Sequence, residues 1–189
     1  NKNSYLDRYS REKNVFHGVL EFDLDDRTLF TLGHTLQTSD ANSPMWGALP
    51  LVYQDGGKTN YSRSTSTATD WAYWDNQENR TFAELAHTFD NGWQAKTVVT
   101  RVEKKSDGSM FYVYGTPNRQ TGAGLYSYPS EYNEKNKQLI VDLQASGPFN
   151  LGGRQHEAAL GGSWSRSELE DLSWYDSSTG TMLPPLEQW

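Results

Sequence analysis

Three pairs of segments that alternate apolar and polar residues constrain the fold of this chain most strongly. Within residues 16–24, the even positions are Phe, Gly, Leu, Phe and Leu, and the odd positions include His17, Glu21 and Asp23. Within residues 28–37, positions 30, 32 and 36 are again apolar. A period of two residues indicates a β-strand with one apolar face. The two segments meet at residues 25–27 (Asp-Asp-Arg), so they predict a hairpin.

The same pattern returns twice. Residues 83–89 and 93–99 flank Asp-Asn-Gly at 90–92, and Asn-Gly predicts a type I′ turn because both residues tolerate a positive φ. Residues 139–145 and 158–164 form a third pair across GPFNLGGRQ at 147–155. The later stretch SRSELEDLSWY at 165–175 is consistent with a strand extension or a short helix. The sequence thus predicts six strands in three antiparallel hairpins.

The connections between hairpins are much longer than the turns within them. They extend from about Thr38 to Gln77 and from about Lys104 to Lys137. Loops longer than about 15 residues are uncommon in compact domains and are usually functional. Short turns alternating with long loops, joined to strands of about ten residues, are typical of an outer-membrane β-barrel. A soluble β-sandwich shows the same alternation, so the strand pattern leaves both architectures open.

Composition excludes several other classes of protein. The net charge is -7 and the 17 Lys and Arg residues are scattered, so nucleic acid is not an expected partner. Cysteine is absent, which excludes disulfides and thiolate metal sites. No run of 18 apolar residues occurs, so no membrane-spanning helix is expected. Aromatic residues make up 13% of the chain, which argues against disorder.

Four long motifs carry a family resemblance. They are MWGALPLVYQDG (45–56), NYSRSTSTATDWAYWD (60–75), FDNGWQAK (89–96) and DLQASGPFNLGGRQHEAALGGSWSRS (142–167). In this order, across roughly residues 5–166, they resemble the barrel of TonB-dependent siderophore receptors, most closely those for ferripyoverdine. The resemblance implies an all-β fold, in which antiparallel hairpins form part of a transmembrane β-barrel with long extracellular loops.

The family resemblance also implies a domain organisation and a function. Such receptors place an N-terminal plug inside a barrel of about 22 strands, so residues 1–189 are expected to be one partial barrel domain without the plug. The expected activity is uptake of a ferric siderophore at the bacterial outer membrane, with no enzymatic step. Iron would arrive already chelated, so no cofactor bound directly by the protein is expected. The expected partners are the siderophore, the TonB system acting through the missing N-terminal part, and outer-membrane lipid.

In this family, aromatic residues on the extracellular loops and upper barrel wall line the ligand pocket. The resemblance therefore assigns ligand contacts to four residues, Trp46, Trp74, Tyr112 and Tyr114. Trp and Tyr suit a bulky, partly planar chelate because they supply large, rigid contact areas. The alternative is that these rings pack loops together or form an interfacial aromatic belt. Trp71 and Tyr73 alternate with Trp74, so they are expected to point away from it and to be structural.

Charged and metal-ligating residues give weaker signals. Arg63 is a candidate for pairing with an anionic chelate, as is Arg119, although loop arginines more often hold carbonyls or carboxylates. The four histidines lie far apart and none has a partner at metal-ligand spacing, so no metal ligand is expected among them. Two of them lie beside apolar positions of strands and are interpreted as wall histidines with satisfied hydrogen bonds. The acidic residues 23–26 lack the spacing and glycine of a calcium loop, which favours a solvated turn.

Two other functions remain open from the residues themselves. A soluble secreted β-sandwich could bind glycans through the same exposed rings, and a β-rich glycosidase could use a pair from the 24 acidic residues. A membrane barrel instead needs an apolar band on the outward face of every strand. His87 and Thr97 interrupt that band in this sequence. Finally, the paired prolines of TMLPPLEQW (181–189) do not match the strand expected next, which predicts a loop there.

Overall fold

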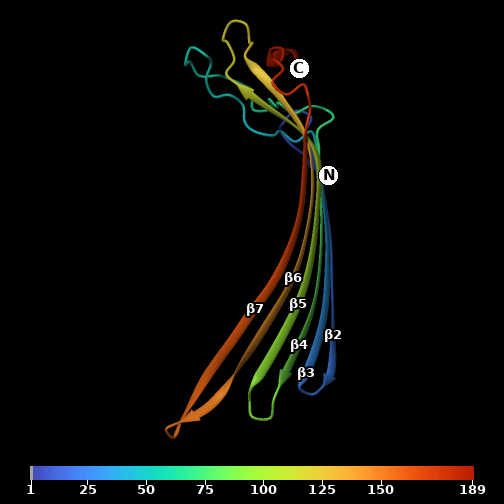
Figure 1. The fold of residues 1–189 in the computed structure, drawn as a ribbon, viewed down its shortest axis with the longest axis vertical. Helices are drawn as coiled ribbons and strands as arrows, with labels where there is room; N and C mark the ends of the chain where they lie inside the picture. Colours follow the sequence, from blue (N-terminus) through green and yellow to red (C-terminus); the bar gives the residue numbers. More distant parts are fainter. Residues whose placement is uncertain (1) are drawn as a thin grey trace.

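The computed structural model describes residues 2–189, with side chains described from Ser4 onward. The chain forms one antiparallel sheet whose seven strands follow one another in sequence order (Figure 1). The all-β prediction is confirmed, and the six predicted strands correspond to β2 through β7. The elements are β1 (Lys2–Asn3), β2 (Ser10–Asp25), β3 (Thr28–Asn42), β4 (Tyr73–Thr88), β5 (Gln94–Gly115), β6 (Leu125–Leu151), β7 (Arg154–Tyr175) and the 3-10 helix η1 (Leu186–Gln188).

Three short turns join the strands at one end of the sheet. At β2–β3, the Asp25 carboxylate accepts hydrogen bonds from the backbone N–H of Arg27 and the Thr28 hydroxyl, at 2.8 and 2.9 Å. This is the solvated Asp turn that the sequence predicts. At β6–β7, Leu151 pairs with Arg154 across Gly152 and Gly153, which both have positive φ, so residues 147–151 belong to β6 and not to a loop.

The prediction of a type I′ turn at Asn91-Gly92 is wrong. Phe89 N–H donates to the Trp93 carbonyl at 2.8 Å, which leaves the three-residue loop 90–92. Within it only Gly92 has a positive φ, of 82°. A three-residue hairpin loop needs the left-handed conformation at its last residue alone, and glycine supplies it without steric cost.

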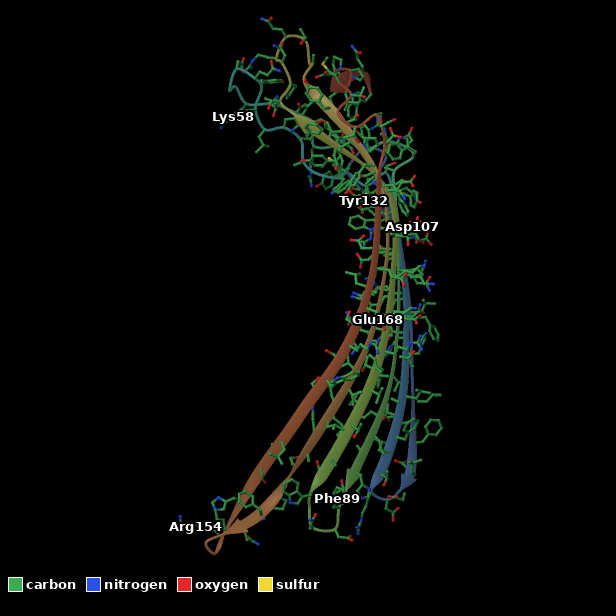
Figure 2. The ribbon with its side chains drawn as sticks, in the orientation of Figure 1. Lys58, Phe89, Asp107, Tyr132, Arg154 and Glu168 are labelled. Atoms are coloured by element: carbon green, nitrogen blue, oxygen red, sulfur yellow. The ribbon has the colours of Figure 1, made fainter. Side chains whose placement is uncertain are left out.

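The long strands correct one predicted connection. Residues 104–137 do not form a loop, because β5 continues to Gly115, β6 begins at Leu125, and the two pair throughout. Only residues 116–124 connect them. Residues 165–175 likewise belong to β7, so the strand extension holds and the helix does not. Only residues 43–72, between β3 and β4, form a long connection of the expected kind. Figure 2 shows Lys58 of this loop at the end of the sheet opposite Phe89 and Arg154.

The two faces of the sheet differ in polarity. One face, called the apolar face below, carries large exposed apolar side chains near the turn end, whereas the opposite polar face carries residues such as Glu21, Glu84 and Lys104. Cross-strand pairing places six side chains of the apolar face in one row: Leu20, Leu32, Ala83, Val99, Val141 and Trp164. Two rows further toward the loop end on the same face, a row begins with Phe16 and Leu36 and ends with Lys137 and Glu168. The apolar band therefore crosses the rows obliquely, as tilted barrel strands require.

Histidines on the sheet have cross-strand partners. His87, which interrupts the apolar band, lies 2.8 Å from the Thr28 hydroxyl through Nδ1, and its ring meets Phe89 edge-on at 4.5 Å. His17 and His34 make the same kind of contact with directly opposed threonines, at 2.8 and 2.9 Å. Each of these three histidines therefore has a side-chain hydrogen-bond partner on the neighbouring strand.

A small core lies at the loop end. Phe111, Val113 and Leu125 are buried on the apolar face of the β5–β6 hairpin, and Leu183, Leu186 and Trp189 of the C-terminal segment pack against them. The C-terminal segment also hydrogen-bonds to β6, since Leu183 N–H donates to the Leu125 carbonyl at 2.8 Å. It thus covers the hairpin without being a full strand. Within residues 2–189, no helix is both long enough and apolar enough to cross a membrane.

The oblique apolar band predicts a lipid-facing surface. In the full-length protein reconstituted into lipid, Leu32→Arg is expected to lower the free energy of unfolding by about 2 to 4 kcal/mol, because an arginine near the bilayer midplane is poorly solvated. Thr38→Arg, on the same strand and face but above the band, should cost about 0 to 1 kcal/mol. Denaturant unfolding measures both, and equal losses would contradict the assignment of this face.

Candidate ligand-binding site

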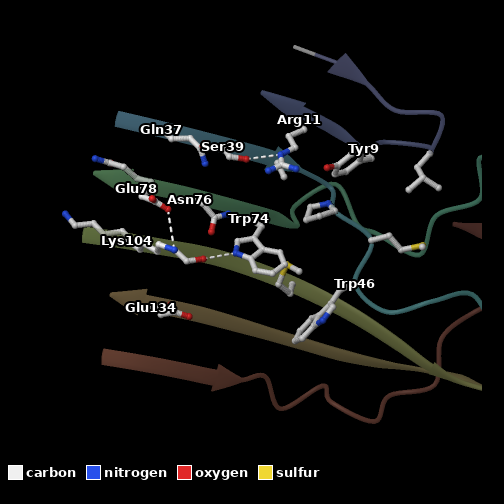
Figure 3. Close-up of a pocket in the computed structure, with 18 residues that line it drawn as sticks. Tyr9, Arg11, Gln37, Ser39, Trp46, Trp74, Asn76, Glu78, Lys104 and Glu134 are labelled. Carbon is white, nitrogen blue, oxygen red and sulfur yellow. Dashed lines mark hydrogen bonds and ion pairs between the residues drawn. The ribbon is translucent and has the colours of Figure 1, made fainter. Parts of the chain in front are cut away.

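A hollow of about 780 Å³ lies on the polar face where the loop 43–72 meets the sheet (Figure 3). Strands β2 through β6 all contribute to its walls. The lining of the hollow includes Arg11, Trp46, Trp74, Glu78, Lys104 and Glu134. Trp46, Trp74 and Arg11 lie at the loop end of the hollow, whereas Glu78, Lys104 and Glu134 lie further down the sheet.

Trp74 is held at the edge of the hollow by one hydrogen bond. It is the second residue of β4, and the alternation of the strand directs its side chain to the polar face. The indole Nε1–H donates to the Ser106 hydroxyl of β5 at 2.7 Å. The residue is still 46% exposed, so the ring has a defined position and remains accessible to a ligand.

Trp46 lies in the long loop and is placed by tyrosines of β5 and β6. Its ring contacts Tyr112 at 5.9 Å and Tyr132 at 5.1 Å between centroids, edge-on in both cases. The backbone of Trp46 also forms an isolated parallel bridge with Tyr112. Gly47 has φ 90°, and a Cβ there would overlap the Tyr112 ring, so the close approach of loop and strand requires glycine at this position.

A ladder of tyrosines continues from Trp46 along the polar face of the β5–β6 hairpin. Tyr112 and Tyr114 stack at 6.4 Å, and Tyr114 stacks on Tyr126 at 5.6 Å. Tyr128 lies directly across from Tyr112 and contacts Tyr175 of β7 at 5.5 Å. The structure therefore brings four of the predicted residues, Trp46, Trp74, Tyr112 and Tyr114, to one face.

Sequence reasoning missed Tyr126, Tyr128, Tyr132 and Tyr175. The signal was present, because the three tyrosines of β6 share even parity in LYSYPSEYN and therefore one face of a strand. These three tyrosines lie within residues 104–137, which the sequence predicts to be a loop and the structure shows to belong largely to β5 and β6. Trp71 and Tyr73 do point away from Trp74, as predicted: Trp71 packs on Phe111 at 5.7 Å, and the Tyr73 hydroxyl donates to Asp107 at 2.6 Å.

The two candidate arginines lie away from the hollow. The Arg63 guanidinium sits over the Tyr5 ring, 4.5 Å from its centroid, and Arg63 does not line the hollow. Its predicted ligand contact stays a prediction. Arg119 binds the carboxylate of Asp55 through two hydrogen bonds, at 2.7 and 3.1 Å. Arg119 therefore holds a loop carboxylate, which is the more common role of a loop arginine, and the structure gives it no place in the hollow.

The charges beside the hollow are of both signs. Lys104 Nζ lies 3.4 Å from the Glu78 carboxylate, and the Arg11 Nε–H donates to the Ser39 hydroxyl at 2.8 Å. Glu134 lies on the neighbouring strand. In the part of the chain from 2 to 189, no three His, Asp or Glu side chains cluster in a way that could hold a metal ion. The arrangement suits a large polar ligand with planar parts, since rings offer stacking surface and the charged groups offer hydrogen bonds.

The Asp55 carboxyl has the most strongly lowered pKa in the loops. The Arg119 guanidinium and the Gly57 N–H both donate to it, which lowers its pKa from 3.8 to about 2. A depressed pKa means that the contact is fully present above pH 3.8 and is lost as the pH falls through about 2.

We therefore expect Asp55 to stay ionised from pH 8 down to about pH 4. A carbon NMR titration of labelled aspartate in the full-length protein should give a midpoint near 2 for this residue. Arg119→Gln removes the guanidinium that is the main cause of the shift, so the midpoint should move upward. An unchanged midpoint in this variant would show that Arg119 does not hold the carboxylate.

Comparison with known proteins identifies relatives of the whole sheet, although no family model matches the chain. The chain is 34% identical over 171 residues to the ferric-pyoverdine BN7/BN8 receptor of Pseudomonas putida, an alignment that covers 90% of this chain and 21% of that receptor. It is 32% identical over 198 residues to the ferripyoverdine receptor of Pseudomonas aeruginosa, with 96% and 23% covered. The chain thus spans about a fifth of the length of these relatives.

Solved structures agree with this assignment. The crystal structure of the outer-membrane ferripyoverdine receptor of Pseudomonas aeruginosa, bound to ferripyoverdine, superposes with a TM-score of 0.86 at 30% identity, covering 93% of this chain and 23% of that one. The ferric preacinetobactin receptor of Acinetobacter baumannii gives 0.74 at 14% identity, covering 98% and 27%, and shares the fold. The chain therefore belongs to the TonB-dependent siderophore receptors of the bacterial outer membrane and corresponds to part of their β-barrel.

Proposed function

We propose that the protein containing this chain takes up a ferric siderophore, and that the hollow beside Trp46 and Trp74 is where the chain contacts it. The observation that carries the proposal is the aromatic surface that extends from Trp46 along the tyrosine ladder on the polar face. In membrane barrels the polar face lines the interior. The rings therefore lie where a ligand entering from the loop side would meet them.

The chemistry of a ferric siderophore fits this surface. A chelate that wraps iron is bulky, partly planar and rich in oxygen, so it can stack on rings and accept hydrogen bonds from hydroxyl and ammonium groups. Iron would enter as part of the ligand, held by the siderophore's own donor atoms. Ferripyoverdine is the first candidate, because the relatives that match most of this chain are receptors for it. Binding and release break no covalent bond.

The remaining parts of the proposal concern partners and domain structure. We infer that residues 1–189 are one part of a larger barrel, because β7 pairs only with β6 among the described residues and its other edge is free to pair. Outer-membrane lipid would cover the apolar face. Energy coupling would come from the TonB system, acting through the N-terminal region of the receptor.

Glycan binding by a β-sandwich is not supported. A sandwich buries the apolar face of each sheet against a second sheet. Over residues 2–189 there is one sheet, and Leu20, Phe22, Leu160 and Trp164 of its apolar face remain exposed. The matched relatives are receptors and not enzymes, which removes the glycosidase as well.

Substitution of the two tryptophans tests the proposed site. Trp46→Ala and Trp74→Ala in the full-length protein should each weaken the binding of a ferric siderophore by about 1 to 3 kcal/mol, the range for losing a stacking aromatic side chain. Calorimetric titration of the purified receptor with ferripyoverdine measures the change in affinity.

Trp71→Ala is the matched control, since Trp71 packs on Phe111 on the opposite face. The affinity of the Trp71→Ala protein for ferripyoverdine should equal that of the unaltered protein. Unchanged affinity in both test variants would refute the placement of the ligand, and no binding of any ferric siderophore by the unaltered protein would refute the function.

A further inference from the structure

Two segments far apart in sequence are joined at the loop end by Asp55 and Arg119. Arg119 Nε and Nη2 donate to the two carboxylate oxygens of Asp55, at 2.7 and 3.1 Å, in a bidentate pair. Asp55 belongs to the long loop 43–72, and Arg119 belongs to the tip of the β5–β6 hairpin. The pair therefore connects the loop that carries Trp46 to the hairpin that carries the tyrosine ladder.

Other contacts hold the Arg119 side chain in this position. Its guanidinium lies over the Tyr53 ring, 4.7 Å from the centroid. A Cβ on Gly57 would overlap the guanidinium, so glycine leaves the space that Arg119 occupies. Beside the ion pair, Gln54 N–H donates to the Pro117 carbonyl at 3.0 Å, and the Gln54 side chain donates to the Thr116 carbonyl at 3.1 Å. The ion pair is thus one part of a local network.

The loop has a second attachment to the same strand. Trp46 forms a parallel bridge with Tyr112, so the loop segment 46–55 runs in the same direction as residues 112–119. Among the described residues, no hydrogen bond joins 47–53 to β5 or to the tip 116–124. The position of this segment relative to the β5–β6 hairpin therefore depends on its two ends. One end is Trp46 at Tyr112, and the other is held by the contacts of Gln54 and Asp55 with residues 116–119, among which the Asp55–Arg119 pair is the only ion pair between the described residues.

We propose that Asp55 and Arg119 form a latch that positions Trp46 for ligand binding. The inference deepens the proposed function and depends on it. Arg119 and Asp55 are positioning residues, since the ligand need not touch them. Without the latch the loop would populate positions in which Trp46 leaves Tyr112. Only the fraction in the competent position would bind, so the apparent affinity falls by that fraction.

Four variants of the full-length protein separate the latch from other effects. Arg119→Gln removes the ion pair, and Gly57→Ala displaces the guanidinium while it keeps every charge. Arg154→Gln is the charge-matched control, because Arg154 is an exposed residue at the start of β7, at the opposite end of the sheet (Figure 2). The charge-reversed pair Asp55→Arg with Arg119→Asp should restore part of the contact.

Two quantities are measured for each variant. The first is the rate of trypsin cleavage after Lys58, an exposed residue of the latched loop. The second is the affinity for ferripyoverdine. Arg119→Gln and Gly57→Ala should raise the cleavage rate and weaken binding by about 3- to 10-fold each, a modest effect because exposed ion pairs contribute little individually. Arg154→Gln should change neither, and the charge-reversed pair should fall between Arg119→Gln and the unaltered protein.

A double-variant comparison tests positioning directly. If the latch acts through Trp46, then Arg119→Gln in the Trp46→Ala protein should weaken binding by less than twofold further, whereas an unrelated structural defect would add its full effect. Full additivity overturns the positioning role, as does faster cleavage with unchanged affinity in the single variants. Unchanged cleavage in both single variants overturns the latch itself. If the unaltered protein binds no ferric pyoverdine, the proposed function fails, while the cleavage rates still decide whether the latch exists.

Discussion

The antiparallel register between neighbouring strands determines which side chains share a face of the sheet. Side chains alternate along a strand, so a slip of one residue in any pairing would move a whole strand of apolar groups to the polar side. The pairing of Leu20 with Leu32, and of Val99 with Val141, keeps the apolar side chains on one face across the sheet. The same register places Trp74 and the tyrosines of β5 and β6 on the other face. The proposed lipid-facing surface and the proposed ligand-binding surface thus depend on one set of backbone hydrogen bonds.

Strand length has a second consequence for the site. About ten residues suffice for a strand to cross the hydrocarbon layer, and β5 and β6 have 22 and 27. Their upper halves project beyond the apolar band as a hairpin with two different faces. One face presents the tyrosine ladder, and the other buries Phe111, Val113 and Leu125 under the C-terminal segment. The hairpin is therefore a support against which both the long loop and the C-terminal segment can pack.

Contacts between distant loops then give the aromatic surface its shape. Trp46 contacts residues of β5 and β6 that follow it by 66 and 86 positions, and Arg119 contacts an aspartate 64 positions before it. Each contact also requires a nearby glycine. A Cβ at Gly47 would overlap the Tyr112 ring, and a Cβ at Gly57 would overlap the Arg119 guanidinium. The loop is irregular in backbone, yet its aromatic side chains have defined partners.

The sequence by itself determined six strands and their three hairpins, because period-two alternation and short turn motifs are local properties. The family followed from the resemblance of four long motifs. The sequence also identified Trp46, Trp74, Tyr112 and Tyr114 as candidates, although through resemblance and not through geometry. It misassigned residues 104–137, since polar residues that alternate on a projecting hairpin resemble a loop when no partner strand is known.

Only the tertiary structure decided which rings lie together and that Arg119 holds Asp55 while Arg63 covers Tyr5. The physical reason is that strand formation depends on neighbouring residues, whereas the packing of loops depends on pairs separated by dozens of residues.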